Sequence, residues 1–238
     1  MVLYEPRGAA REYCERAVNL YRGCAHGCLY CYAPKVLRED RSTFRVARPR
    51  PGILEALARD LHRERGEHEV LLCFTCDPYP PEPVEQGTTR LAIEMLGKAG
   101  YRPIILTKAG HPTRRDFDLL VEFGGQYGTT LTFPDAERSR MWEPAAATPR
   151  ERMETLREAH ERAIATWVSL EPVLDPEASL DLIGLTKHYV DTYKVGRWNH
   201  DDRADAIDWD DFGHRAEALL QALGKRHLIK AALRARMT

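Results

Sequence analysis

The feature that most constrains the fold is an alternation of short apolar runs and amphipathic helices along most of the 238 residues. Apolar residues recur at helical spacing within 52–65 and 88–99, and short strand patterns follow at 70–74 and 103–107. Strands that alternate with helices in this way predict βα units and a parallel sheet. We therefore expect an α/β fold of about six such units, fewer than the eight of a closed barrel.

The same alternation continues toward the C-terminus. We expect further helices at 113–123, from 148 onward, at 179–187 and at 208–223, and further strands at 127–133, 165–170, 190–195 and 226–233, with an earlier strand near 19–21. Thr148, Pro149 and Glu151 form a capping-box pattern, which predicts a helix start there. We expect residues 1–18 to be an N-terminal arm and residues 19–238 to be one core domain, with a metal-binding loop at 24–31.

Composition excludes some classes of protein. With 35 basic and 36 acidic residues, the net charge is −1, which does not fit a protein that holds nucleic acid through a global positive field. A local basic stretch at 34–50 could be a solvated face or a place for substrate phosphates. There is no apolar run long enough to cross a bilayer and no signal-peptide pattern. We expect a cytoplasmic protein without a membrane partner.

Three of the six cysteines, Cys24, Cys28 and Cys31, lie in one tight loop with C-x3-C-x2-C spacing. Thiolates select zinc, copper(I) or iron–sulfur clusters. Closed zinc sites and [4Fe–4S] clusters normally take four protein ligands, so three cysteines predict a cluster with one open, catalytic iron. The alternative is a Cys3His zinc knuckle that includes His26, in a nucleic-acid-binding protein without catalysis, although His26 makes that arrangement cramped.

Polar and charged residues follow or end several predicted strands. They include Thr75, Cys76, Asp77, Lys108, Thr130 and Glu171, and, at the last of these strands, Lys194, Arg197, Asn199 and His200. Ligands of parallel α/β folds bind at the carboxyl ends of the strands, so these side chains should meet at one rim. Such a rim suits a zwitterionic cofactor that contains a nucleoside.

The motif C-x3-C-x-aromatic-C, with Tyr30 as its aromatic residue, resembles the signature of the radical S-adenosylmethionine (SAM) enzymes. The wider run R-G-C-x-H-G-C-x-Y-C-Y-A is similar to the branch related to spore photoproduct lyase. The resemblance implies a partial (β/α)6 TIM-type barrel and a [4Fe–4S] cluster on Cys24, Cys28 and Cys31, with SAM on the open iron. It further implies reductive cleavage of SAM to a 5′-deoxyadenosyl radical and an external one-electron reductant of the flavodoxin or ferredoxin type.

The resemblance also implies roles for single residues. Tyr30 would pack on the adenine of SAM, and the SAM contacts would come from Thr75, Asp77, Lys108, Thr130 and Glu171. The lyase returns a hydrogen atom from a cysteine, whose place Phe74 takes here, so we assign the donor role to Cys76 as a hypothesis. A DNA lesion is the implied substrate. RNA, a peptide or a small molecule remain open alternatives.

Overall fold

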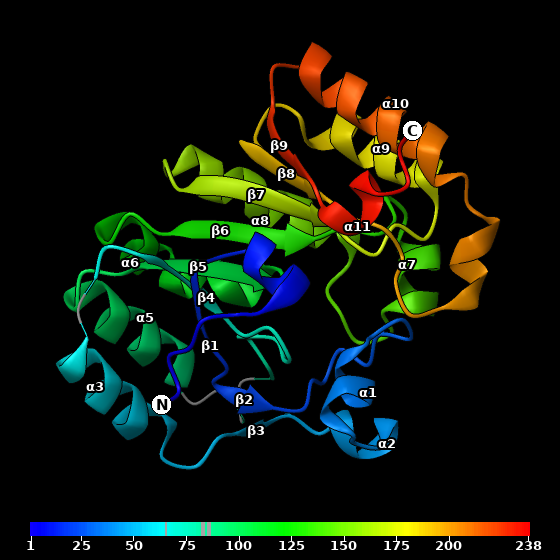
Figure 1. Ribbon diagram of the computed structural model, residues 1–238. Coiled ribbons are helices and arrows are strands. Elements are labelled where there is room, and N and C mark those ends of the chain that lie inside the picture. Colours follow the sequence, from blue (N-terminus) through cyan, green and yellow to red (C-terminus); the bar gives the residue numbers. More distant parts are fainter. Residues whose placement is uncertain (65, 82–83, 85–86) are drawn as a thin grey trace.

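The computed structural model describes residues 1–64, 66–81, 84 and 87–238, and its centre is a parallel sheet of seven strands within that part of the chain. In spatial order the strands are β1 (Arg16–Val18), β4 (Glu69–Leu72), β5 (Arg102–Thr107), β6 (Gln126–Thr130), β7 (Ala165–Leu170), β8 (Thr192–Val195) and β9 (Arg226–Ile229). Neighbouring strands pair in parallel throughout (Figure 1). The predicted α/β class of partial-barrel type is confirmed.

The connecting helices lie on one face of the curved sheet (Figure 1). They are α3 (Ile53–Arg63), α5 (Thr88–Lys98), α6 (Phe117–Glu122), α8 (Pro149–Glu161), α9 (Pro176–Thr186) and α10 (Trp209–Ala222). Helix α5 packs against β5, α8 against β6 and β7, and α10 against β9. The capping box predicted at Thr148 is present, with the Glu151 amide donating to the threonine hydroxyl at 3.2 Å.

Smaller elements surround the sheet. They are η1 (Gly8–Glu12), α1 (Ala33–Leu37), α2 (Arg41–Phe44), η2 (His111–Asp116), α7 (Ala136–Trp142), η3 (Asp202–Ala206) and α11 (Ala231–Arg234). Two short strands, β2 (Tyr21–Arg22) and β3 (Arg48–Pro49), pair in antiparallel fashion. Helices α1 and α2 lie beside this pair, away from the helix-covered face of the sheet (Figure 1). No helix of the described residues is long and apolar enough to cross a lipid bilayer.

The start of the chain differs from our expectation. The first strand of the sheet is β1, where Ala17 and Val18 are fully buried, whereas Tyr21 belongs to the separate β2–β3 pair. Backbone bonds of 2.9 and 3.0 Å join Tyr4 to Ala17, and Leu3 is buried in the core. The first residues therefore pack on the sheet, and the division of the chain at residue 18 stays a prediction.

Three other strands also end earlier than predicted. The strand predicted at 70–74 ends at Leu72, because Cys73 adopts a left-handed φ of 71° that no strand continues through. The strand predicted at 127–133 ends at Thr130. The run predicted as a strand at 226–233 divides into β9 and α11, with Lys230 as the N-cap of the helix. The helix predicted at 52–65 is α3, and its expected last residue lies outside the described part of the chain.

The interior of the sheet is filled at the middle of the strands. A small apolar cluster there consists of Cys14, Ala17, Leu71, Ile104 and Trp167. Gly128 makes room for it, since a β-carbon at that position would lie 2.3 Å from the indole ring of Trp167. This packing closes the interior below the carboxyl ends of the strands, so that the open space of the barrel lies where the predicted site residues gather.

Candidate active site

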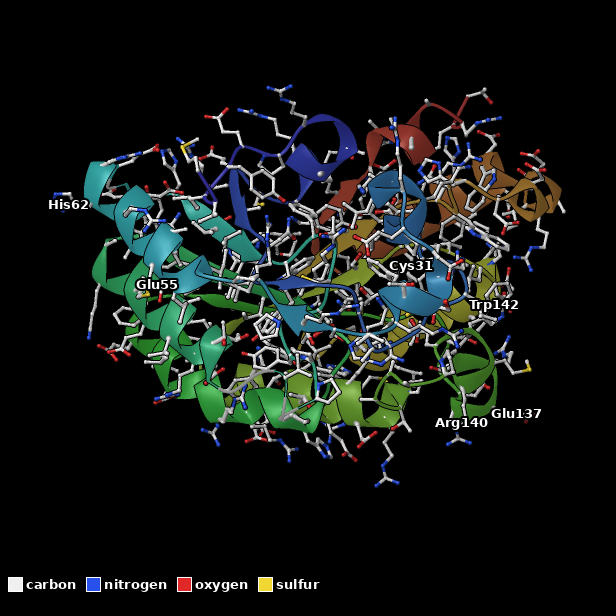
Figure 2. All side chains as sticks on the ribbon, turned by 90° about the horizontal axis from the view of Figure 1, so that it is seen from below. Cys31, Glu55, His62, Glu137, Arg140 and Trp142 are labelled. Atoms are coloured by element: carbon white, nitrogen blue, oxygen red, sulfur yellow. The ribbon has the colours of Figure 1, made fainter. Side chains whose placement is uncertain are left out.

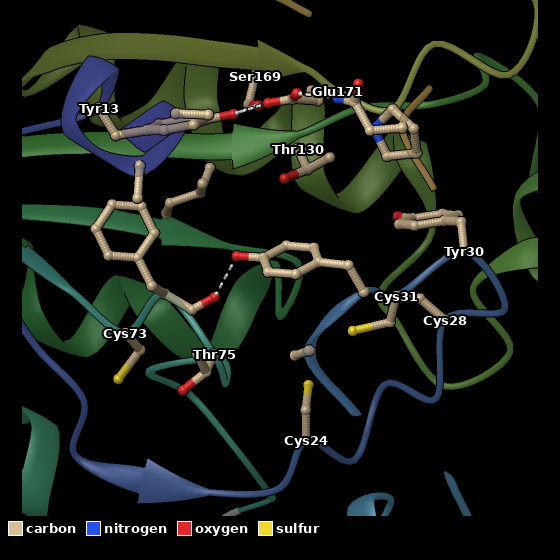
Figure 3. A pocket seen from close by; sticks show the side chains of 18 of the residues that line it. Tyr13, Cys24, Cys28, Tyr30, Cys31, Cys73, Thr75, Thr130, Ser169 and Glu171 are labelled. Carbon is tan, nitrogen blue, oxygen red and sulfur yellow. Dashed lines mark hydrogen bonds between the residues drawn. The ribbon is translucent and has the colours of Figure 1, made fainter. Parts of the chain in front are cut away.

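A cavity of about 420 Å³ lies at the carboxyl ends of the strands. Its walls come from the loop of the three cysteines, from the ends of β4 to β7, from the N-terminal segment around η1, and from the segments that follow β8 and β9. All ten residues to which we assigned a role line this cavity: Cys24, Cys28, Tyr30, Cys31, Thr75, Cys76, Asp77, Lys108, Thr130 and Glu171. The cysteines lie on the opposite side from Tyr13 (Figure 3).

The cysteine loop is held by backbone contacts and by one arginine. The Cys31 amide donates to the carbonyl of Cys28 at 3.2 Å, which closes a tight turn between two of the thiols. Arg41 donates to the carbonyls of Cys28 and Cys31 at 3.3 and 2.9 Å. Gly23 enters the loop at φ 76°, and a β-carbon there would lie 2.4 Å from a facing backbone oxygen. The loop conformation therefore requires glycine before Cys24.

The donor set fits an iron–sulfur cluster. Burial raises the pKa of Cys28 to about 11, and burial followed by the charge of Asp77 raises the pKa of Cys24 well above its usual value. Thiolates at these positions need a cationic partner, which a bound metal supplies as it displaces the thiol protons. Among the described residues, no three potential ligands converge on one metal ion. Because the cysteines of a cubane bind different iron atoms, they need not converge on a single point.

His26 does not act as a fourth ligand of a zinc knuckle in this arrangement. Its Nε2 lies 2.9 Å from a carboxylate oxygen of Asp77, and its Nδ1 lies 3.2 Å from the carbonyl of Ala145. Both ring nitrogens thus lie close to oxygen atoms. The imidazole instead ties the cysteine loop to the segment after β4.

The carboxylate of Asp77 lies at the centre of the site, where hydrogen bonds to neighbouring groups already occupy it. Its carboxylate accepts from the Thr107 hydroxyl at 2.7 Å, from the Lys108 amide at 2.9 Å and from the Tyr79 amide at 2.9 Å. Burial alone would raise its pKa, but His26 and these hydrogen bonds hold the pKa below its usual value. The ionised carboxylate joins the ends of β4 and β5 to the cysteine loop.

Tyr30 is part of a buried polar network. Its hydroxyl donates to Glu143, and Glu143 pairs with Arg152, whose side chain is fully buried together with the carboxylate. Arg152 also donates to the carbonyl of Thr130 at 2.8 Å and to the hydroxyl of Ser139 at 2.9 Å. The network fixes the aromatic residue of the cysteine loop relative to the end of β6.

Lys108 brings a positive charge to the cavity. Its ammonium lies 5.7 Å from the centre of the Tyr30 ring. Burial lowers its pKa, but the negative charges of Cys28 and Glu143 outweigh burial and raise the pKa above its usual value. Thr75 and Thr130 add hydroxyl groups to the wall, and Thr75 is held by its amide, which donates to Asn19 at 3.1 Å. The wall can thus bind an anionic group next to polar donors.

Glu171 lies on the far wall and is already paired. It accepts from the Tyr13 hydroxyl at 2.6 Å (Figure 3). It also accepts from Asn199 at 3.2 Å and forms an ion pair with the buried Lys230. Gly196 permits this arrangement, since a β-carbon there would lie 2.6 Å from the carboxyl carbon of Glu171. Glu171 therefore orders the wall that faces the cysteines.

Cys76 lines the cavity and packs against the main apolar core. Burial, followed by the neighbouring Cys73, raises its pKa well above the usual value, so it is a protonated thiol at neutral pH. We interpreted Cys73 as a core residue within a strand. It is buried, but it lies just beyond β4, where its sulfur accepts from the Leu20 amide at 3.5 Å, and it also borders the cavity.

Several residues of the site were missed in the sequence. Tyr13 and Lys230 contact Glu171, and Arg7 lines the cavity. The rule that ligands bind beyond strand ends would have found Lys230 if the last strand had been ended at Ile229. Nothing in the polar N-terminal segment indicated that Tyr13 reaches β7.

Comparison with known families gives a match over most of the chain. A family model described as "Radical SAM superfamily" matches residues 18–185. An uncharacterized protein of Acidianus two-tailed virus is 30% identical over 174 residues, which cover 67% of this chain and 56% of the viral protein. An uncharacterized protein of Mycobacterium tuberculosis is 28% identical over 186 residues, covering 71% of this chain and 52% of that protein. The chain thus spans about half the length of these relatives.

Solved structures share the fold at low sequence identity. A spore photoproduct lyase variant with bound AdoMet and dinucleoside spore photoproduct has a TM-score of 0.65 and 15% identity, over 94% of this chain and 65% of that chain. Streptococcus suis SuiB bound to S-adenosylmethionine has a TM-score of 0.65 and 10% identity, over 91% of this chain and 47% of that chain. At these identities the likeness establishes the architecture.

Proposed function

The chain belongs to the radical SAM superfamily, and we propose that it cleaves SAM reductively at a [4Fe–4S] cluster held by Cys24, Cys28 and Cys31. The observation that carries this proposal is that the three cysteines border the same cavity as the polar ends of β4 to β7. In this family the cluster and SAM together supply a 5′-deoxyadenosyl radical that abstracts hydrogen from a substrate. The protein supplies binding, orientation and shielding from water.

We assign the binding of SAM to the side of the cavity next to the cysteines. Lys108, Thr75 and Thr130 provide donors there, and the Tyr30 ring provides an apolar surface. Asp77 acts by positioning, because its carboxylate already accepts three hydrogen bonds from neighbouring groups. Glu171 likewise orders the opposite wall through its contacts there. The sequence predicted all of these residues as cofactor contacts, and the roles given to them here are proposals.

For the substrate we propose a lesion in nucleic acid. The lining of the cavity includes the cationic Arg7 and Arg197 and the aromatic rings of Tyr32 and Phe74. Cations suit phosphates, and aromatic rings suit unstacked bases. The spore photoproduct lyase with the same fold was solved with a dinucleoside spore photoproduct, which further supports this class of substrate. We propose Cys76 as the hydrogen donor that completes such a reaction, since it offers a protonated thiol at the cavity.

The direct test uses protein reconstituted anaerobically with iron and sulfide. With dithionite and SAM, we expect 5′-deoxyadenosine to form, and we expect iron and sulfide in amounts that correspond to one cluster per chain. A protein that binds zinc alone and leaves SAM intact would contradict the proposal and favour the zinc knuckle.

Lesion-containing DNA tests the proposed substrate separately. Binding should weaken steeply with salt if phosphates are contacted, and 5′-deoxyadenosine formation should be coupled to conversion of a dinucleoside spore photoproduct. If neither occurs while SAM is still cleaved, the nucleic-acid part of the proposal is wrong. The substrate would then be sought among RNA, peptides and small molecules.

The Cys76→Ala variant tests the donor role. We expect it to cleave SAM without substrate at a rate within about twofold of the wild type, since a conservative change outside the cofactor contacts has a small effect. With dinucleoside spore photoproduct, the ratio of 5′-deoxyadenosine to repaired product should rise several-fold, because the product radical is not quenched. The Cys73→Ala variant is the matched control and should keep the wild-type ratio. An unchanged ratio for Cys76→Ala would remove Cys76 from the mechanism.

A further inference from the structure

The segment around α1 and α2 exposes an unusual amount of apolar surface. Among the large hydrophobic side chains that are exposed in the described chain, five come from this short stretch: Leu29, Tyr32, Val36, Leu37 and Val46. Tyr32 and Val36 also line the substrate cavity, so the exposed apolar side chains outside the cavity are Leu29, Leu37 and Val46. Leu29 is 47% exposed and Val46 is 55% exposed. Single exposed hydrophobic residues are common, but several within one stretch are typical of an interaction site. We call the exposed side chains of residues 29–50 that do not line the substrate cavity the outer face.

The outer face is also strongly cationic. Its exposed basic residues are Lys35, Arg38, Arg41, Arg45, Arg48 and Arg50. Within the described residues, none of these six forms an ion pair with a carboxylate, whereas the neighbouring Arg22 pairs with Glu39 at 2.7 Å. In a chain whose net charge is −1, these charges are a local concentration. The outer face therefore combines uncompensated positive charge with exposed apolar side chains.

The outer face lies directly over the cysteine loop. A second, small hollow is lined by Cys24, Cys28 and Cys31 together with Arg41, Arg45 and Phe44. Arg41 holds the loop carbonyls from this side. Figure 2 shows Cys31 beside the ribbon of this segment. The three thiols thus border the substrate cavity on one side and the outer face on the other.

We propose that the outer face docks an acidic protein that carries one electron. This inference rests on the proposed function, since reductive cleavage of SAM needs an electron from outside the chain. In the transfer, the partner is oxidised by one electron and the metal site is reduced by one electron. No covalent bond forms or breaks at the interface, and no proton is transferred there.

A protein fits this face better than nucleic acid does. Interface cores favour aromatic and aliphatic side chains, whereas a phosphate backbone offers exposed residues such as Val46 and Leu37 no apolar partner. The positive charge selects an acidic partner and speeds encounter. The contact of Arg41 with the cysteine loop also places a docked protein next to the residues that would hold the metal site.

The test uses the reconstituted protein and reduced flavodoxin, an acidic flavoprotein, as the probe. The variant carries Lys35→Glu, Arg38→Glu and Arg48→Glu, which leaves Arg41 and Arg45 in contact with the cysteine loop. The matched control carries Arg59→Glu, Arg226→Glu and Arg236→Glu, three exposed residues outside this face with the same total change in charge. Isothermal titration calorimetry at low salt measures flavodoxin binding, and 5′-deoxyadenosine formation is measured with flavodoxin and with dithionite.

We expect the variant to bind flavodoxin at least about 10-fold more weakly and to lose a similar factor in flavodoxin-driven cleavage, because several charge contacts change sign. Its dithionite-driven cleavage should match that of the control. Wild-type affinity for flavodoxin in the variant would overturn the inference, and so would an equal loss in the control. The inference would also fall if the variant lost duplex DNA binding and kept flavodoxin binding. Failure of the wild type to cleave SAM with dithionite would instead refute the proposed function.

Discussion

Replacing Arg152 with methionine is expected to destabilise the protein by about 3–5 kcal/mol, the range found when one partner of a buried ion pair is removed. The side chains of Arg152 and Glu143 are both fully buried. Burial alone would raise the pKa of Glu143, but Arg152 and Lys108 hold it below its usual value, so the carboxylate is charged. Methionine would leave that charge in the interior without its main partner. It would also leave the carbonyl of Thr130 without its arginine donor.

Thermal unfolding followed by circular dichroism measures this effect. For a chain of this length, the expected loss corresponds to a decrease of about 6–20 °C in the unfolding midpoint. The control is Arg150→Met, on the same helix, because Arg150 is largely exposed and pairs with Glu154 at the surface. Its midpoint should stay close to the wild type.

A double variant separates the ion pair from general packing. Adding Glu143→Gln to Arg152→Met removes the unpaired charge, so it should recover part of the lost stability. If Arg152→Met and Arg150→Met have the same unfolding midpoint, the buried network around Arg152 does not stabilise the fold as we describe. If the double variant is less stable than Arg152→Met alone, the buried charge is not the cause of the loss.

The fold was largely predictable because the pattern of apolar residues reports burial. The strand at 165–170 was placed at its observed bounds, since its residues after Ala165 are all buried and the run is flanked by polar segments. Boundaries failed where backbone conformation decided them. The left-handed φ of Cys73 ends β4, and no residue pattern identifies a cysteine that will adopt it. Strand propensity also could not predict β1, because the residues of this short strand are covered by other segments of the chain.

The predicted site residues do gather, because residues at the carboxyl ends of neighbouring parallel strands must lie near one another. What single positions could not reveal was how each side chain is used. Asp77 and Glu171 both line the cavity, yet their carboxylates are largely engaged with partners that are distant in sequence, such as His26 and Lys230. Local spacing carries no information about such pairings. The same holds for Glu143 and Arg152, whose pairing no spacing in the sequence indicated.

Replacing Cys28 with alanine is expected to remove the largest share of activity, lowering dithionite-driven SAM cleavage by more than about 100-fold. Loss of groups that merely support a metal ligand already costs about 10–100-fold, and a ligand itself should cost more. Cys28 is buried, and its pKa is raised to about 11 by that burial. Its thiolate is therefore stable when a metal balances the charge, and alanine provides no replacement ligand. Iron and sulfide per chain should fall together with 5′-deoxyadenosine formation.

The matched control is Cys14→Ala, which removes another buried thiol from the small apolar cluster below the cavity. Burial also raises the pKa of Cys14 to about 11, so the two thiols are alike in protonation and differ in where they lie. Cys14→Ala should keep its iron, its sulfide and its cleavage rate. Normal iron content and activity in Cys28→Ala would refute the ligand assignment. Equal losses in both variants would mean that the fold, and not the metal site, responds to removal of a thiol. A loss that occurs only in Cys28→Ala would show that metal binding and SAM cleavage depend on the loop of three cysteines. It would also show that they do not depend on the number of buried thiols.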